Sequence, residues 1–463
     1  MINSTSTQPF RSPRAQSRGR EGERTLLVSR LRSTRTGLVA VAALLAIATP
    51  ASAETIAITG GKVIIGDGST PIEDGTVVIR DGNVVAAGSG VAVPTGARQI
   101  DASGKWVTPG VFAGFSRLGL SEVDAVDGTN DKSGGKSGFS AGIDIAPAID
   151  PYRTPFAVNR AAGVTRAVVA PDAGSNMFAG QGAVVDLGAD ASPVTKARAF
   201  QFVEFGEAGA ELTGGSRAGT FATFRAMLRE AQEYAANKAS FDDELLRAED
   251  ARALLPVLRG ETRLLIHVEG ANDINNLIAL GKEFPAIRMV FVGASEGWRV
   301  AEAIAAAGIP VIGSALNDLP ASFEMVAATQ SNIGRMRDAG VKVAIGMIND
   351  RDSHQLRYST QYAGNLVSLE RVPGATGLNW DEAFAAISSV PADIMGMADK
   401  LGSLRPGRAA DVVIWDGDPL ELSSAVVTVM IDGVEQPLAN RQDRLRVRYA
   451  RPQEGNLPKA YDR

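Results

Sequence analysis

Short runs of valine and isoleucine alternate with Gly-Asp, Asp-Gly and Gly-Ser turns between residues 55 and 98. Apolar and polar positions that alternate between such turns are typical of antiparallel strands. The same pattern returns near the end of the chain, in ADVVIWDGDP and SSAVVTVMIDGVEQ between residues 410 and 436. The pattern therefore predicts short strands at both ends of the chain.

Between these ends, strand-like apolar runs alternate with segments of helical spacing, clearest at 217–238, 244–258, 273–283, 296–307 and 380–388. This alternation predicts an α/β fold, a TIM-like (β/α)8 barrel with parallel strands. The chemistry of such barrels lies at the C-terminal ends of the strands. Eight strands are expected, the third with the weakest pattern, at 111–117, 164–170, 183–187, 199–205, 263–268, 287–292, 309–313 and 341–347.

Two stretches carry a family resemblance: VTPGVFAGFSRLGL at 107–120 and PADIMGMADKLGSLRPGRAADVVIWDGDP at 391–419. Together they resemble the amidohydrolase superfamily, the metal-dependent hydrolases related to imidazolonepropionase and dihydroorotase. The resemblance spans roughly 55–436 and implies a composite β-sandwich, built from both ends of the chain, beside the barrel. The implied domains are a leader and signal (1–53), an N-terminal sandwich segment (54–108), the barrel (109–402), a C-terminal sandwich segment (403–450) and a tail (451–463).

The resemblance also implies a two-metal centre, but the residues at its ligand positions differ. Phe115 and Arg117 take the places of the two histidines on the first strand. The chain has only two histidines, so four imidazole ligands are impossible. His267 falls where the family has its strand-five histidine, whereas Gly293 takes the strand-six histidine position. We therefore expect at most one divalent ion, Zn²⁺ or Mn²⁺, held at His267, or none.

Two of these replacements suggest roles in the site. Arg117 is a permanent cation that cannot ligate a metal. It either clamps an anionic substrate group through its fork or pairs with Glu207 or Asp350. Phe115 either packs in the core or stacks against a ring of the substrate.

Further candidates follow from the other strand ends. Glu207, after strand four, and Glu296, after strand six, are expected to bind substrate. Asp350 and His354 lie four residues apart, which on a helix suits a carboxylate-oriented general base. For His267 and His354, an ordinary polar contact near a strand end or in a solvated loop stays an alternative.

A glycine-rich polar insert at 121–144 directly follows the first barrel strand. Its place suits a lid over the site, and its composition equally suits a surface loop.

The first 36 residues carry eight arginines and two glutamates, and an apolar run at 37–53 ends in Ala-Ser-Ala. This pattern predicts a signal peptide cleaved after Ala53, and hence an exported, periplasmic or secreted protein with no stable membrane span after cleavage. Removing 1–53 leaves 39 basic and 50 acidic residues, a net charge of about −11, which argues against a nucleic-acid partner. The absence of cysteine excludes disulfides, thiolate ligands and a cysteine nucleophile.

Two functions remain open. The resemblance implies that the protein hydrolyses carbon–nitrogen bonds, other than peptide bonds, in a small amide. Cyclic amides are included in this class. The alternative is a catalytically inactive relative that binds a small molecule or partners an active paralogue. A homo-oligomer is compatible with both.

Overall fold

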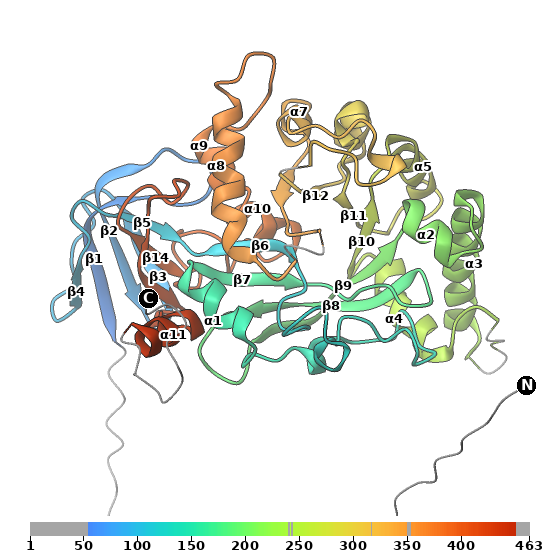
Figure 1. The fold of residues 1–463 in the computed structure, drawn as a ribbon, viewed down its shortest axis with the longest axis horizontal. Coiled ribbons are helices and arrows are strands. Elements are labelled where there is room, and N and C mark those ends of the chain that lie inside the picture. Colours follow the sequence, from blue (N-terminus) through green and yellow to red (C-terminus); the bar gives the residue numbers. More distant parts are fainter. Residues whose placement is uncertain (1–53, 239–240, 242–243, 316, 350–352, 451–463) are drawn as a thin grey trace, which may run out of the picture. The chain divides into compact units, whose positions relative to one another are not determined.

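The computed structural model describes residues 54–450, apart from 239–240, 242–243, 316 and 350–352. The predicted leader and signal, the tail and Asp350 lie outside the described residues. Within the described ranges, two eight-stranded sheets carry the fold (Figure 1).

The first sheet is built from both ends of the chain. Its strand order is β16-β15-β14-β5-β1-β2-β3, and β4 pairs with β1. The strands are β1 (Thr55–Val63), β2 (Ile72–Arg80), β3 (Asn83–Gly88), β4 (Arg98–Asp101), β5 (Trp106–Pro109), β14 (Val412–Trp415), β15 (Val426–Ile431) and β16 (Val434–Glu435).

The join lies between β14 and β5, which pair antiparallel from Val412 opposite Pro109 to Trp415 opposite Trp106. The two ends therefore form one composite sheet, as the resemblance implied.

The second sheet is a nearly closed barrel with the order β13-β12-β11-β10-β9-β8-β7-β6. The backbone N–H of Met347 donates to the carbonyl of Phe115 over 3.0 Å and links the ends of the first and last strands. All eight predicted strands are present: β6 (Val111–Ser116), β7 (Val164–Val169), β8 (Phe178–Asp186), β9 (Val194–Glu204), β10 (Arg263–Val268), β11 (Met289–Gly293), β12 (Val311–Gly313) and β13 (Val343–Ile345).

The third barrel strand departs from the predicted parallel arrangement. β8 pairs antiparallel with both β7 and β9. Parallel neighbours need a crossover of about a dozen residues or more. The connections at 170–177 and 187–193 are shorter and contain no helix, so the chain turns back on itself twice.

The helices cover the outside of the barrel, and the five predicted helical segments are confirmed. They correspond to α3 (Arg217–Ala236), α4 (Ala248–Leu258), α5 (Ala271–Gly281), α6 (Ala301–Ala307) and α9 (Trp380–Ala385). The others are α1 (Thr154–Ala161), α2 (Gly206–Leu212), α7 (Asn332–Asp338), α8 (Ser359–Leu369), α10 (Ser389–Ile394) and α11 (Arg441–Tyr449). In the described residues, none of these helices has the length and apolarity needed to span a bilayer.

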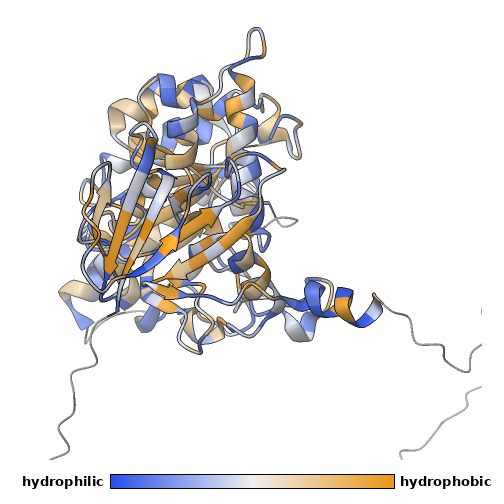
Figure 2. Ribbon diagram, turned by 90° about the vertical axis from the view of Figure 1, so that its left-hand side faces the viewer, coloured by the Kyte–Doolittle hydropathy of each residue, from blue (hydrophilic) through white to orange (hydrophobic). Residues whose placement is uncertain are grey.

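Successive side chains of a barrel strand point alternately into the barrel and out towards the helices, and so belong to two different apolar cores. On β10, Leu265 belongs to the cluster inside the barrel, whereas Leu264 and Ile266 pack in the cluster shared with the helices. His267 follows Leu265 by two residues and so projects to the inner side. Figure 2 looks from the side on which the composite sheet lies in Figure 1, and strands on that side are largely orange, that is, apolar.

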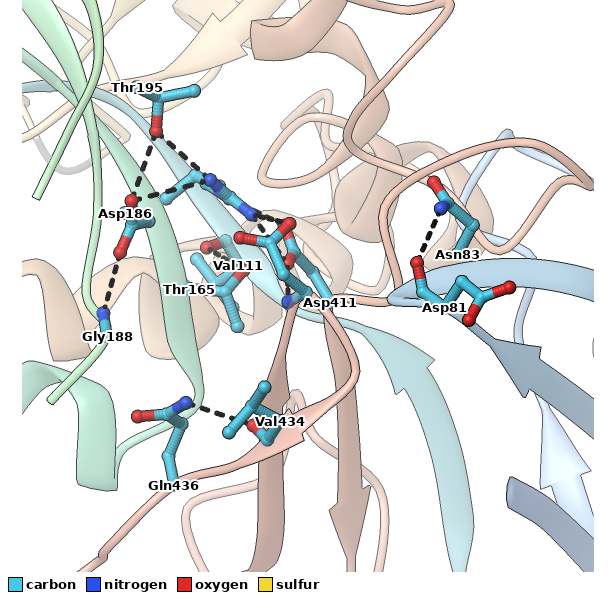
Figure 3. Close-up of polar contacts among 12 residues, drawn as sticks. Asp81, Asn83, Val111, Thr165, Asp186, Gly188, Thr195, Asp411, Val434 and Gln436 are labelled. Carbon is cyan, nitrogen blue, oxygen red and sulfur yellow. Dashed lines mark hydrogen bonds and ion pairs between the residues drawn. The ribbon is translucent and has the colours of Figure 1, made fainter. Parts of the chain in front are cut away.

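A buried arginine joins the barrel to the composite sheet. Arg166 on β7 donates to both carboxylate oxygens of Asp411, over 2.8 and 3.0 Å, and to Asp432 over 2.6 Å. Asp186 and Thr195 reach the same place from β8 and β9 (Figure 3). Burial raises the pKa of Asp186, although the Arg166 charge opposes this shift.

Candidate functional site

A polar cavity of about 510 Å³ opens at the C-terminal ends of the barrel strands. This is the end at which barrels of this kind carry their chemistry. Its lining includes Phe115 on β6, Arg117 directly after β6, Phe202 and Glu204 on β9, His267 on β10, and Lys132 from the polar insert.

His267 lies between two carboxylates. Its Nδ1 is 2.6 Å from Glu204 Oε2, and its Nε2 is 3.1 Å from Glu269 Oε1. Glu269 also accepts a hydrogen bond from the backbone N–H of Ser295 over 2.8 Å. Both ring nitrogens are thus engaged by groups of the protein.

These contacts fix the charge state of the pair. Burial alone would lower the pKa of His267, but the Glu204 charge and the bonds to both carboxylates outweigh it and hold the pKa well above 6.5. Burial alone would raise the pKa of Glu204, but His267, with a smaller effect of Arg117, lowers it. At neutral pH the pair is therefore an imidazolium beside a carboxylate.

The strand-six position, Gly293, has no room for a larger residue. Its φ is +92°, and a Cβ there would lie 2.4 Å from Glu269 Oε1. The carboxylate of Glu269 occupies the space that a side chain at this position would need.

Arg117 is held entirely by its own surroundings. One nitrogen donates to the carbonyl of Ala170 over 2.8 Å and to that of Pro171, and another pairs with Asp172. Its guanidinium carbon lies 5.1 Å from the Phe115 ring centre. Arg117 therefore pairs with an acid, as one alternative expected, but the acid is Asp172 and not Glu207.

Phe115 is both a core residue and part of the cavity wall. It is 1% exposed and belongs to the cluster inside the barrel. Its ring lies 5.4 Å from that of Phe202, which also lines the cavity.

The insert lines the cavity. Asn130, Lys132 and Ser133 all contribute to the wall. The carbonyl of Lys132 accepts a hydrogen bond from the Asp172 N–H over 2.8 Å. Asp250 Oδ1 accepts from the N–H groups of both Ser140 and Gly142. The insert is thus fastened to the barrel at both the cavity and its far end.

Three predicted site residues lie away from this cavity. Glu207 contacts Arg217 at 3.7 Å. Glu296 accepts hydrogen bonds from the N–H groups of Ala271 and Ala327. His354 lies 3.5 Å from Asp124, and none of the three lines the cavity. The proposed pairing of His354 with Asp350 falls outside the described residues.

Sequence reasoning missed Glu204 as the partner of His267. The signal was present, because Phe200, Phe202 and Glu204 alternate along one strand and so share one face. Asp172 could also have been predicted near Arg117, because it closely follows β7, the strand that pairs with β6. Nothing in the pattern singled out Lys132.

The described donor set does not fit a metal centre. Both ring nitrogens of His267 are hydrogen-bonded, and a metal would have to replace one of these bonds. Within 54–450, gaps excepted, no group of three or more His, Asp or Glu side chains is arranged to hold an ion. We therefore derive no step through a metal.

Comparisons with known proteins agree with the architecture. Residues 222–435 match the model of a family described as the amidohydrolase family. The amidohydrolase tasK of Hapsidospora irregularis is 25% identical over 383 residues, covering 74% of this chain. Imidazolonepropionase of Mesorhizobium japonicum is 28% identical over 119 residues, 25% of this chain. The matches span only 38% and 28% of the lengths of these two relatives.

Solved structures show the same fold. An amidohydrolase from Thermotoga maritima aligns with a TM-score of 0.72 and 24% identity, covering 82% of this chain and 99% of that one. A prolidase complexed with N-methylphosphonate-L-proline aligns with a TM-score of 0.51 and 16% identity, covering 82% and 99%. The chain is thus similar to amidohydrolases in sequence, most clearly over residues 222–435, and it shares its fold with these solved structures.

Proposed function

We propose that this protein is a hydrolase that cleaves a carbon–nitrogen bond, other than a peptide bond, in a small amide. The observation that carries the proposal is the Glu204–His267 pair, 2.6 Å apart, at the reactive end of the barrel and on the cavity wall. The relatives named above, an amidohydrolase and an imidazolonepropionase, support the reaction class.

The pair suits general-base chemistry without a metal step. Glu204 Oε2 is bonded to His267, and in the described residues Oε1 has no hydrogen-bond partner. We infer that Oε1 takes a proton from water as the water oxygen attacks the carbonyl carbon. The carbon–nitrogen bond then breaks, and the amine leaves with that proton. His267 keeps both its protons, orients Glu204 and stabilises its charge.

A second candidate, a non-catalytic binding protein or partner of an active relative, rests on a different observation. Both nitrogens of His267 and the guanidinium of Arg117 are already bonded to the protein. In this candidate these groups only shape a polar pocket for a small molecule.

The test is hydrolysis of a panel of cyclic amides and N-acyl amino acids by the wild type, Glu204→Gln and Glu207→Gln. Glu204→Gln removes the base and should lower kcat about a hundredfold or more. Glu207→Gln makes the same change outside the cavity and should leave kcat unchanged.

Elemental analysis of the same preparations, grown with zinc and manganese and purified without chelator, completes this test. Activity with well under one ion per chain is expected. Activity that follows the metal content and disappears in His267→Ala would contradict the metal-free step. Ligand binding with no turnover of any substrate would favour the binding protein.

A further inference from the structure

Lys132 is a nearly buried cation in the cavity wall, and among the described residues its ammonium group has ion-pair contacts but no hydrogen bond. Its side chain is 12% exposed, and Nζ lies 3.5 Å from Asp124 and 3.8 Å from Asp172. Within the described ranges, no acceptor makes a hydrogen bond with Nζ. A buried ammonium has three donors, and leaving them unsatisfied is costly.

One of the two nearby acids has another permanently charged partner. Asp172 pairs with Arg117, whereas Asp124 lies 3.5 Å from the imidazole of His354. Lys132 is therefore not required to neutralise Asp172. The backbone bond from the Asp172 N–H to the Lys132 carbonyl holds this position at the cavity whatever side chain it bears.

Two neighbours add donors on the same wall. Asn130 uses its Oδ1 to accept from the Lys132 N–H, which leaves its amide N–H groups for a ligand. Ser133 Oγ accepts from the Gly135 N–H, so its hydroxyl proton is also available. The insert thus presents an ammonium, an amide and a hydroxyl, which together suit an oxyanion.

The charges around the cavity favour an anion with a single negative charge. Among the described residues, Arg117, Lys132 and His267 are cationic, and the acids in the cavity wall or beside these cations are Asp124, Asp172, Glu204, Glu211 and Glu269. The second charge of a phosphate dianion would increase the repulsion from these carboxylates, so the subsite favours a monoanion.

We propose that Lys132, with Asn130 and Ser133, forms a subsite for a substrate carboxylate, so that the cavity selects N-acyl amino acids and related carboxylate-bearing amides. This inference rests on the proposed function, because it supplies the substrate class for the same cavity. In this arrangement the carboxylate binds the insert, and the amide carbonyl faces Glu204 at the end of β9. The aromatic walls of Phe115 and Phe202 suit an apolar acyl group.

A matched ligand pair tests the subsite by calorimetry on the full-length protein. N-benzoylglycine carries the carboxylate, and N-benzoylglycinamide has nearly the same shape without the charge. Glu204→Gln protein serves for binding, so that turnover does not interfere. The acid should bind about ten- to a hundredfold more tightly than the amide, the strength of a charge-assisted hydrogen bond.

Lys132→Met, combined with Glu204→Gln, should abolish this preference. Lys136→Met removes the same charge from an exposed position of the same insert and should keep it.

The outcomes separate this inference from the proposed function. Equal binding of acid and amide, or no binding of either at millimolar concentration, overturns the subsite. So does a Lys132→Met variant that behaves like Lys136→Met, or inorganic phosphate that competes as well as the carboxylate. Charge-selective binding without any hydrolysis contradicts the hydrolase and supports the subsite. Hydrolysis of the amide as fast as the acid contradicts the subsite alone.

Discussion

The imidazole of His267 depends for its charge on the two carboxylates that flank it. Its pKa lies well above 6.5, so its contribution to stability is complete below that pH and is lost as the pH rises through the higher value in the folded protein. The pKa of Glu204 lies below 4.5, so its contribution is complete above that pH and is lost on acidification. The pair stabilises the protein most between pH 4.5 and 6.5.

This window predicts the behaviour of His267→Gln. The variant leaves Glu204 and Glu269 in a buried site without a cation and should lower the free energy of unfolding at pH 6 by about 3 kcal/mol. The loss should shrink towards alkaline pH, where the wild-type imidazole is neutral. Urea unfolding at several pH values measures this difference. His354→Gln is the control. His354 has a 3.5 Å contact with Asp124, so this variant should lower the free energy of unfolding only slightly at every pH. A loss that stays the same at every pH from 6 upward, to the highest pH at which the protein is folded, would mean that His267 does not carry a charge.

The same residues show what a sequence predicts about a site. His267 was expected near the site because of its flanks and its strand position, and it lines the cavity. Glu207 was expected in the site because it follows the strand, whereas the alternation of the strand itself turns Glu204 inward. The position of Lys132 was beyond prediction, since it depends on how a polar insert folds back over the barrel.

Among the elements, β8 shows that apolar periodicity predicts where a strand lies, whereas the lengths of its connections predict its direction. Apolar patterning found the strand, but it carries no information on direction. The short links at 170–177 and 187–193 do carry that information, because they leave no room for a crossover helix. Counting connection lengths would have predicted the two antiparallel pairs.

Gly293, at the end of β11, allows a prediction about stability. Gly293→Ala combines a left-handed φ of +92° with a Cβ 2.4 Å from Glu269. Strain of about 1–3 kcal/mol and a displaced carboxylate worth about 1–3 kcal/mol should together cost about 2–6 kcal/mol of unfolding free energy. Gly308→Ala has a φ of +64° and no atom within 4 Å of the added Cβ, so it should show the strain alone. Similar losses in both variants would mean that Glu269 moves aside freely.

At the scale of the whole molecule, the two ends of the chain meet in one sheet that the barrel touches through a charged cluster. The sequence showed strands at each end, and only the family resemblance implied their pairing. The register of β14 against β5 brings Asp411, just before β14, to Arg166 on β7. A buried arginine needs such a partner, yet no local pattern names an acid 245 residues away.

The cluster makes a prediction about how firmly the two sheets are held together. Asp411→Asn removes the charge that receives two hydrogen bonds from Arg166, at a side chain only 5% exposed, and should cost about 3 kcal/mol of unfolding free energy. Asp432→Asn removes a charge from a side chain that is 56% exposed and should cost less than about 1 kcal/mol. Urea unfolding of the two variants provides the comparison. Equal and small losses would show that strand pairing and apolar packing hold the composite sheet to the barrel without this cluster.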